Sequence, residues 1–278
     1  RKRPTGMFPG RAAVASGLIL GALGLALIGP FLPADPFAQD LLARNQPPDN
    51  AYWLGTDHLG RDVAARLLRG TSLSLGIGVA ATAIALLLGG GLGLLATALG
   101  RWLDYLLFGL VDLIRTLPGV LLALVLVVTL GSGVWPVILA LGITFAPHYA
   151  RVARAEYRRE AAADYVAYAR SQAADTWHLL ARHILPNVAG ALVTQTVIIL
   201  PRAIVTESVL SFLGVGVAPD TPTWGRMIAQ ASRYVETAPH AVLIPVLALS
   251  LVTLSLAILG EQLRHWLDPL RQGAAQSP

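Results

Sequence analysis

The chain has 278 residues, of which 55% are hydrophobic and 13% are charged, against about 25% charged residues in an average soluble domain. This imbalance argues against a soluble enzyme and favours a protein that lies in lipid. Two kinds of site are also excluded: the single lysine, Lys2, cannot serve a nucleotide-binding P-loop, and a chain without cysteine has neither disulfides nor thiolate metal sites.

Long runs without a charged residue predict the membrane helices. An α-helix needs roughly 20 such residues to cross the bilayer. The longest run is divided at Gly131, Gly133 and Pro136, because these are turn residues. We therefore predict an all-α membrane protein with six transmembrane helices, at 12–32, 72–99, 104–130, 134–153, 188–211 and 239–260.

The first predicted helix follows four basic residues and has no small-residue cleavage site after it. We expect it to be retained rather than removed as a signal peptide. The expected organisation is a helix with an outer loop at 1–70, followed by a helical membrane domain at 71–278.

The positions of the arginines predict the orientation in the membrane. Six of them lie between two long apolar runs: Arg151, Arg154, Arg158, Arg159, Arg170 and Arg182. By the positive-inside rule, this loop at 151–187 faces the cytoplasm. Both termini are then cytoplasmic, and the segments 33–70 and 213–238 lie outside.

Two residue pairs could suggest an enzyme. Ser72 and His240, at the outer ends of two predicted helices, are the best candidates for an intramembrane serine protease. His178 and His183 are five residues apart, so their rings should diverge on an α-helix, and we expect no metal site there.

The first informative motif is Gly-Thr-Asp-x-x-Gly-Arg-Asp, formed by Gly55, Thr56, Asp57, Gly60, Arg61 and Asp62. Its two glycines permit turn geometry, and its charged side chains can tie a short outer element together by charge-assisted hydrogen bonds. Such an element either caps the helices or contacts a binding partner.

The second motif lies in the arginine-rich loop. Asp164 is a good N-cap residue, and the chain from there to Leu180 contains no glycine or proline. These features predict a short amphipathic helix at 164–178, with Val166, Ala169, Ala173 and Trp177 on its apolar face. The alternative is a helix that lies on lipid headgroups.

The third motif runs from Ala203 through Glu207 and Ser211 to Gly216, and continues at Pro222-Thr223-Trp224-Gly225. We expect its Gly- and Pro-rich part to fold back as an irregular outer loop covered by protein or water. Arg202 precedes the motif inside a predicted helix, where a charged side chain needs a cavity or a partner. Glu207 is about 140° around the helix from Arg202, so the two should not pair.

Together these stretches resemble the second permease subunit of the dipeptide, oligopeptide and nickel family of bacterial ABC importers. The resemblance implies the type I importer permease fold for 71–278, a place in the bacterial inner membrane, and transport of di- or oligopeptides, with nickel or another small solute as the alternative. It implies four kinds of partner, which are a homologous second permease, two ATPase subunits, an extracytoplasmic substrate-binding protein and membrane lipid. It implies no nucleic acid, no cofactor in this chain, and ATP with Mg²⁺ on the ATPases.

The resemblance also assigns the site residues. The 164–178 segment would be the coupling helix that docks into the ATPase, through Asp164, Tyr165, Ala167, Tyr168, Ala169, Arg170 and Ala173. The translocation pathway would include Arg202, Glu207 and Ser211. Trp224 and Gly225 would join the Gly55–Asp62 motif in the outer loops.

One departure concerns the coupling segment. The family has Glu-Ala-Ala where Ala167-Tyr168-Ala169 stands, and a glycine near Ala173. A glutamate at position 167 would have completed a capping box with Asp164, so we expect the helix to lose one reciprocal hydrogen bond.

Overall fold

A computed structural model describes residues 9–29, 35–172 and 175–267. These parts are helical and contain no strand beyond one isolated bridge, between Thr56 and Asp62. The main helices are α1 (Pro9–Ile28), α2 (Val63–Ala85), α3 (Leu92–Leu99), α4 (Arg101–Arg115), α5 (Gly119–Leu130), α6 (Val134–Ala161), α7 (Asp164–Ser171), α8 (Thr176–His178), α9 (Leu185–Phe212), α10 (Trp224–Ala231) and α11 (Pro239–Leu267).

Four continuous helices are long and apolar enough to cross a membrane, at Val63–Leu99, Val134–Ala161, Thr176–Phe212 and Pro239–Arg264. Two of them contain π-helical turns, η3 (Leu86–Gly91) and η4 (Leu179–Ile184). The predicted number of six continuous spans is therefore not reproduced in the part of the chain that the structure describes.

The predicted span at 104–130 is wrong as a single helix. It is divided into α4 and α5, which are bent by 96° at residues 116–118. Pro118 explains the break, because proline disfavours helical geometry in the residue before it and has no amide hydrogen to donate. At the N-terminus, the apolar part of α1, Ala13–Leu27, is shorter than the other spans.

Helix α2 begins nine residues before the predicted start at 72. Asp62 caps it, since its carboxylate accepts a 2.8 Å hydrogen bond from the amide of Ala64. The hydropathy pattern excluded Arg66 from the span, but its side chain is only 1% exposed in the first turns of the helix.

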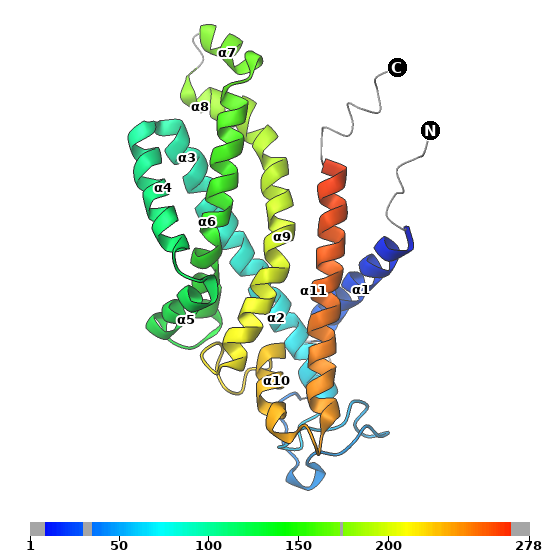
Figure 1. Ribbon diagram of the computed structural model, residues 1–278. Coiled ribbons are helices and arrows are strands. Elements are labelled where there is room, and N and C mark those ends of the chain that lie inside the picture. The colour runs from blue at the N-terminus through cyan, green and yellow to red at the C-terminus, as the bar shows by residue number, and fades with distance from the viewer. Residues whose placement is uncertain (1–8, 30–34, 173–174, 268–278) are drawn as a thin grey trace.

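Helix α6 lies at the centre of the bundle and packs against α2, α3, α5 and α9 (Figure 1). Glycine permits the closest contact. A Cβ atom at Gly89 would lie 2.0 Å from the carbonyl oxygen of Ala146, and one at Gly93 would lie 2.8 Å from the Cα of Ala150. These small residues therefore let the backbone of α6 contact the backbone of the Val63–Leu99 helix.

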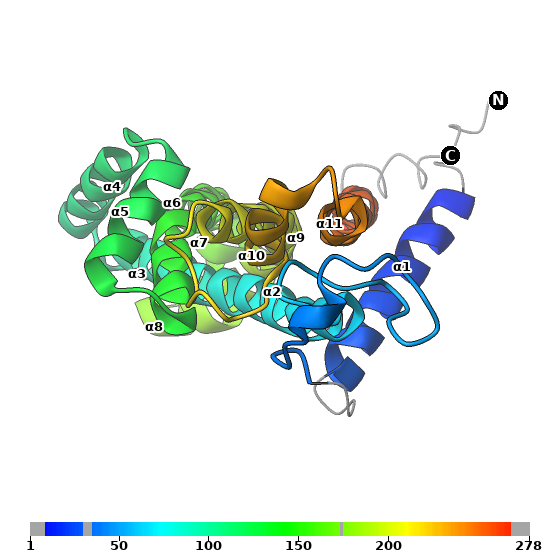
Figure 2. The same ribbon diagram turned by 90° about the horizontal axis from the view of Figure 1, so that it is seen from below.

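The bundle is elongated when viewed from below (Figure 2). Helices α4 and α5 lie at one edge, α6 and α9 lie in the middle, and α11 and α1 lie toward the other edge. Helices α7 and α8 occupy one end of the bundle, hereafter the arginine-rich end (Figure 1). Helix α10 and residues 35–62 occupy the opposite end.

Candidate functional site

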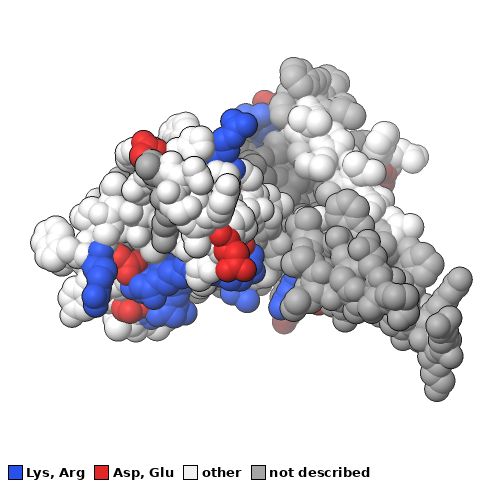
Figure 3. Space-filling view, turned by 90° about the horizontal axis from the view of Figure 1, so that it is seen from above, with Lys and Arg blue, Asp and Glu red and all other residues white. Residues whose placement is uncertain are grey.

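The arginine-rich end is held together by ion pairs between α4 and α6. Asp104 is only 6% exposed and receives Arg154 at 2.5 Å and Arg158 at 2.8 Å. The guanidinium of Arg154 also lies 3.9 Å from the ring centroid of Phe108. Figure 3 looks onto this end and shows arginine and acidic side chains gathered at one side of it.

The predicted single helix at 164–178 is wrong, because α7 ends at Ser171 and α8 begins at Thr176. Asp175 caps α8 by accepting a 2.7 Å hydrogen bond from the amide of His178. A side chain that caps a new helix competes with continuation of the preceding one. Ala173 and the side chain of Arg170 lie outside the described residues.

Asp164 is the first residue of α7 rather than the cap before it. The amides of Val166 and Ala167 both bond to the carbonyl oxygen of Ala163, which occupies the cap position. A capping box between positions 164 and 167 therefore does not fit this helix start.

The expected apolar face is also divided. Val166 is fully buried against the rest of the chain, whereas Trp177 is 56% exposed on α8. Tyr168 is 69% exposed, and the neighbouring Ala167 is exposed as well, while Ala169 is half-buried. Helix α7 therefore presents an aromatic side chain outward while Val166 anchors it.

Tyr165 connects α7 to both long helices beside it. Its hydroxyl donates to the carboxylate of Glu160 on α6 and accepts a 3.0 Å hydrogen bond from the side-chain amide of Asn187 on α9. The phenol group of Tyr165 therefore links α7 to both α6 and α9.

The expectation that His178 and His183 diverge is wrong. Their ring centroids are 5.7 Å apart, because the wider turn of the π-helix η4 brings residues five apart onto one face. The described residues contain no cluster of three or more histidine, aspartate or glutamate side chains suited to a metal ion.

At the opposite end, the Gly-Thr-Asp motif forms a compact buried structure. Gly55 and Gly60 have φ values of +73° and +74°, a conformation that favours glycine, as the motif predicts. Asp57 accepts a 2.7 Å hydrogen bond from Arg61 Nε and lies 3.6 Å from Arg66 Nε.

Gln230 of α10 completes this structure. Its carbonyl oxygen accepts a 3.0 Å hydrogen bond from each of the two guanidinium groups, Arg61 and Arg66, both of which are buried. Its amide donates to the carbonyl oxygen of Pro219 at 2.8 Å. We call Asp57, Arg61, Arg66 and Gln230 the outer charge cluster.

The protease alternative is wrong. Ser72 donates its hydroxyl hydrogen bond to the carbonyl oxygen of Ala26 on α1, whereas His240 Nε2 lies 3.1 Å from the carbonyl oxygen of Thr56. The side chain of Ser72 therefore contacts α1 and that of His240 contacts the 35–62 segment, and the two do not form a serine–histidine pair.

The fold-back loop packs onto the end of α9 through polar groups. Glu207 is fully buried and accepts a 2.7 Å hydrogen bond from Ser211. The amide of Trp224 donates to Ser74 of α2 at 3.1 Å. A Cβ atom at Gly225 would lie 2.2 Å from the carbonyl oxygen of Ser208, so only glycine permits α10 to begin there.

The three residues assigned to the pathway do not share one surface. Arg202 is exposed on α9, whereas Glu207 and Ser211 are buried beneath the fold-back loop. The polar groups of Glu207 and Ser211 face protein rather than an open surface of this chain. The assignment of all three residues to the translocation pathway stays a prediction.

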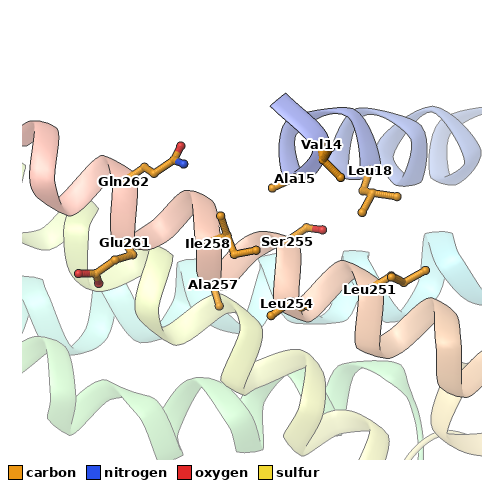
Figure 4. Close-up of a pocket in the computed structure, with 10 residues that line it drawn as sticks. All are labelled: Val14, Ala15, Leu18, Leu251, Leu254, Ser255, Ala257, Ile258, Glu261 and Gln262. Carbon is orange, nitrogen blue, oxygen red and sulfur yellow. The ribbon is translucent and has the colours of Figure 1, made fainter. Parts of the chain in front are cut away.

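A separate hollow lies between α1 and α11, away from every predicted site residue (Figure 4). Its volume is about 710 Å³, and its lining is largely apolar, with Ser255, Glu261 and Gln262 on α11 as the polar groups. Figure 4 shows Val14, Ala15 and Leu18 of α1 facing this stretch of α11.

Sequence reasoning missed Arg66, Gln230 and Asp104. Arg66 and Asp104 carried a signal, because charged residues beside or within apolar runs need partners. Gln230 carried none: it lies 164 residues after Arg66, and one sequence does not reveal such a contact.

Residues 89–272 match the family model described as the binding-protein-dependent transport system inner membrane component. The chain is also 37% identical to the glutathione transport system permease protein GsiD of Pectobacterium atrosepticum, over 92% of this chain and 86% of the relative. The chain belongs to the family of binding-protein-dependent transport system inner membrane components.

Two further relatives are also named as transport system permeases. This chain is 37% identical to the di/tripeptide transport system permease protein DppC of Pseudomonas aeruginosa, over 93% of this chain and 86% of the relative. It is 32% identical to the dipeptide transport system permease protein DppC of Alkalihalophilus pseudofirmus, over 93% and 85%. The chain is thus a membrane transport subunit rather than an enzyme.

A solved structure supports the fold. The MetNI methionine ABC transporter in an inward-facing conformation matches with a TM-score of 0.56 and 16% identity, over 71% of this chain and 96% of that chain. The transport component therefore has the type I ABC importer permease fold. Membership of the family implies that it works with another permease, with ATPase subunits and with a substrate-binding subunit.

Proposed function

We propose that this permease forms one half of the translocation pathway for di- and oligopeptides in an ATP-driven importer. The observation that carries the proposal is the similarity to peptide and glutathione permeases along more than nine-tenths of the chain. The outer motif and the fold-back motif, both characteristic of such permeases, lie within that similarity.

The proposed assembly contains a homologous second permease, two ATPase subunits that bind ATP and Mg²⁺, and an extracytoplasmic binding protein. We place the arginine-rich end in the cytoplasm, supported by the six arginines at 151–187. Both termini are then cytoplasmic, and the outer charge cluster faces the binding protein.

Helix α7 is proposed as the contact with the ATPase. The exposure of Tyr168, together with the link from Tyr165 to α6 and α9, supports this role. Closure of the ATPases on ATP would draw the coupling segments together and open the pathway outward, and hydrolysis would reset it. The difference in contacts between the two states would drive the change.

The test is uptake of a labelled dipeptide into proteoliposomes that contain the whole assembly. We expect ATP-dependent uptake that requires the binding protein, and no ATP hydrolysis by this chain alone. Vanadate-sensitive hydrolysis by the isolated chain would refute its role as a subunit that borrows its ATPase. Uptake of Ni²⁺ in place of peptide would establish the alternative substrate.

A further inference from the structure

Two arginines at membrane depth lie at one level of the bundle without a carboxylate partner. Arg115 is the last residue of α4, directly before the bend at 116–118, and Arg202 lies in the middle of α9. Both side chains are exposed, and neither forms an ion pair with any residue in the described part of the chain.

The bend places Arg115 beside α6. Gly119, at the start of α5, faces Thr144, where an added Cβ atom would lie 3.4 Å from the side-chain methyl group. His148 is one turn farther along α6 from Thr144. Arg115 precedes Gly119 by four residues and therefore lies near the part of α6 that carries Thr144 and His148.

The same level of the bundle includes Arg202. Tyr149 of α6 donates a 3.1 Å hydrogen bond to Thr196 of α9, which fixes the register of these antiparallel helices. Arg202 lies six residues beyond Thr196, roughly 9 Å along the axis, and is therefore level with Thr144.

The acidic groups of the neighbouring elements are already engaged or buried. Asp112 of α4 pairs with Arg151 of α6 at 2.5 Å. Glu207 of α9 is fully buried and bonded to Ser211. Helix α5 contains no charged residue. The net charge of the region around His148 is therefore positive, and it comes from Arg115 and Arg202.

Lipid does not suit this pair, because a charged side chain within the hydrocarbon region is costly unless it faces water or a counter-charge. Val205 and Val209 on α9, which follow Arg202, are exposed, and so are Leu121 and Val125 on α5, which follow Arg115. Two guanidinium groups within an apolar surface are suited to a carboxylate, which they can bind with two parallel hydrogen bonds each.

We propose that Arg115 and Arg202, with His148 beside them, form an anion-recognition site for the carboxylate of the transported substrate. The inference rests on the proposed function and narrows the substrate class to peptides with a free C-terminal carboxylate. The site would hold the peptide by its charged end while the apolar side chains around it remain permissive toward the peptide's own side chains.

The test compares a dipeptide with its C-terminal amide in proteoliposomes that contain the complete importer. Each substrate is supplied at a concentration that gives equal occupancy of the binding protein. The variants are Arg115→Gln, Arg202→Gln and Arg202→Lys. The matched control is Arg101→Gln, because Arg101 is also exposed and lies at the arginine-rich end of α4.

We expect each Gln variant to lower uptake of the free acid about 10-fold, the factor that corresponds to about 1.4 kcal/mol, and to leave uptake of the amide at its wild-type level. Arg202→Lys should retain part of the activity, because the charge remains while the planar fork is lost. Arg101→Gln should transport both substrates normally.

Equal losses for acid and amide in the Gln variants would overturn the site, and so would unchanged uptake of both. Loss of assembly with the second permease in Arg202→Gln would also overturn it, because the carboxylate partner would then belong to that subunit. In all these cases wild-type uptake persists and the proposed function stands. Absence of peptide uptake by the wild-type importer would instead refute the proposed function, and this inference with it.

Discussion

Asp104 near the start of α4 and Arg154 on α6 are joined across the arginine-rich end by a contact of 2.5 Å, in which the carboxylate is almost fully buried. Arg158 shares the carboxylate, and Thr97 donates to it at 3.0 Å. The position of α4, and hence of the bend that follows it, depends on this contact.

Asp104→Asn should lower the free energy of unfolding by about 2–3 kcal/mol, because removal of one partner leaves the other charge uncompensated. The control is Asp112→Asn. Both side chains of its pair with Arg151 are at least half exposed, so the pair should contribute about 1 kcal/mol or less. Thermal unfolding of the purified variants in the same detergent checks this. Equal losses in the two variants would contradict the assignment.

Gly60→Ala should disrupt the outer motif. A Cβ atom there would lie 1.7 Å from the carbonyl oxygen of Asp40, and the φ of +74° disfavours any other residue. We expect a loss of about 3 kcal/mol or more. Gly76→Ala is the control, since Gly76 is an exposed helical glycine with open space beside it, and it should be neutral or stabilising. Wild-type stability of Gly60→Ala would show that the segment tolerates rearrangement.

Acidification should lower the stability of the protein through His58. This residue lies in the 35–62 segment and stacks on Tyr234, with ring centroids 4.9 Å apart. Burial is the main cause that lowers the pKa of His58, and the charges of Arg61, Arg66 and Arg44 add to it, whereas Asp57 opposes them. The unfolded chain binds a proton near pH 6.5, and the folded chain does so only at lower pH. Stability should therefore fall as the pH falls below about 6.5.

The measurement is the difference in melting temperature between pH 7.5 and pH 5.5. His58→Phe retains an aromatic ring for Tyr234 but cannot titrate, so its decrease should be smaller than that of the wild type. Other titrating groups are shared by both proteins and cancel in the comparison. Identical decreases would show that His58 is not the responsible group.

Tyr168→Cys should crosslink to the ATPase in the assembled importer, because Tyr168 is the most exposed aromatic residue of α7. The chain contains no native cysteine, so the reaction would be specific to the introduced one. Tyr105→Cys is a matched control at the same end, where Tyr105 is 79% exposed on α4. Crosslinking of Tyr105→Cys alone would move the ATPase contact from α7 to α4.

The sequence predicted the helical class and most span positions because lipid requires long apolar runs, and such runs are visible residue by residue. The prediction failed where a break in a helix was given too little weight, and where the backbone departed from regular α-helical geometry. Pro118 marked the break between α4 and α5, yet hydropathy alone favoured one span. The π-turn η4 changed which histidines share a face, and no composition rule predicts such a turn.

Within the candidate site, too, the features set by local sequence were predictable and those set by distant contacts were not. The motif glycines were predictable, because turns with positive φ require glycine. The separation of Arg202 from Glu207 also followed from helical spacing. Their environments did not, since the burial of Glu207 depends on a loop that returns from residues 213–223 to cover it.

The contact between Arg66 and Gln230 also constrains the order of biogenesis. The two residues are 164 positions apart in the chain. At a synthesis rate of roughly 5–20 residues per second, Gln230 emerges about 8–30 s after Arg66. During that interval Arg61 and Arg66 lack the side-chain oxygen of Gln230 as a hydrogen-bond partner. The complete outer charge cluster can therefore form only after α10 has been translated.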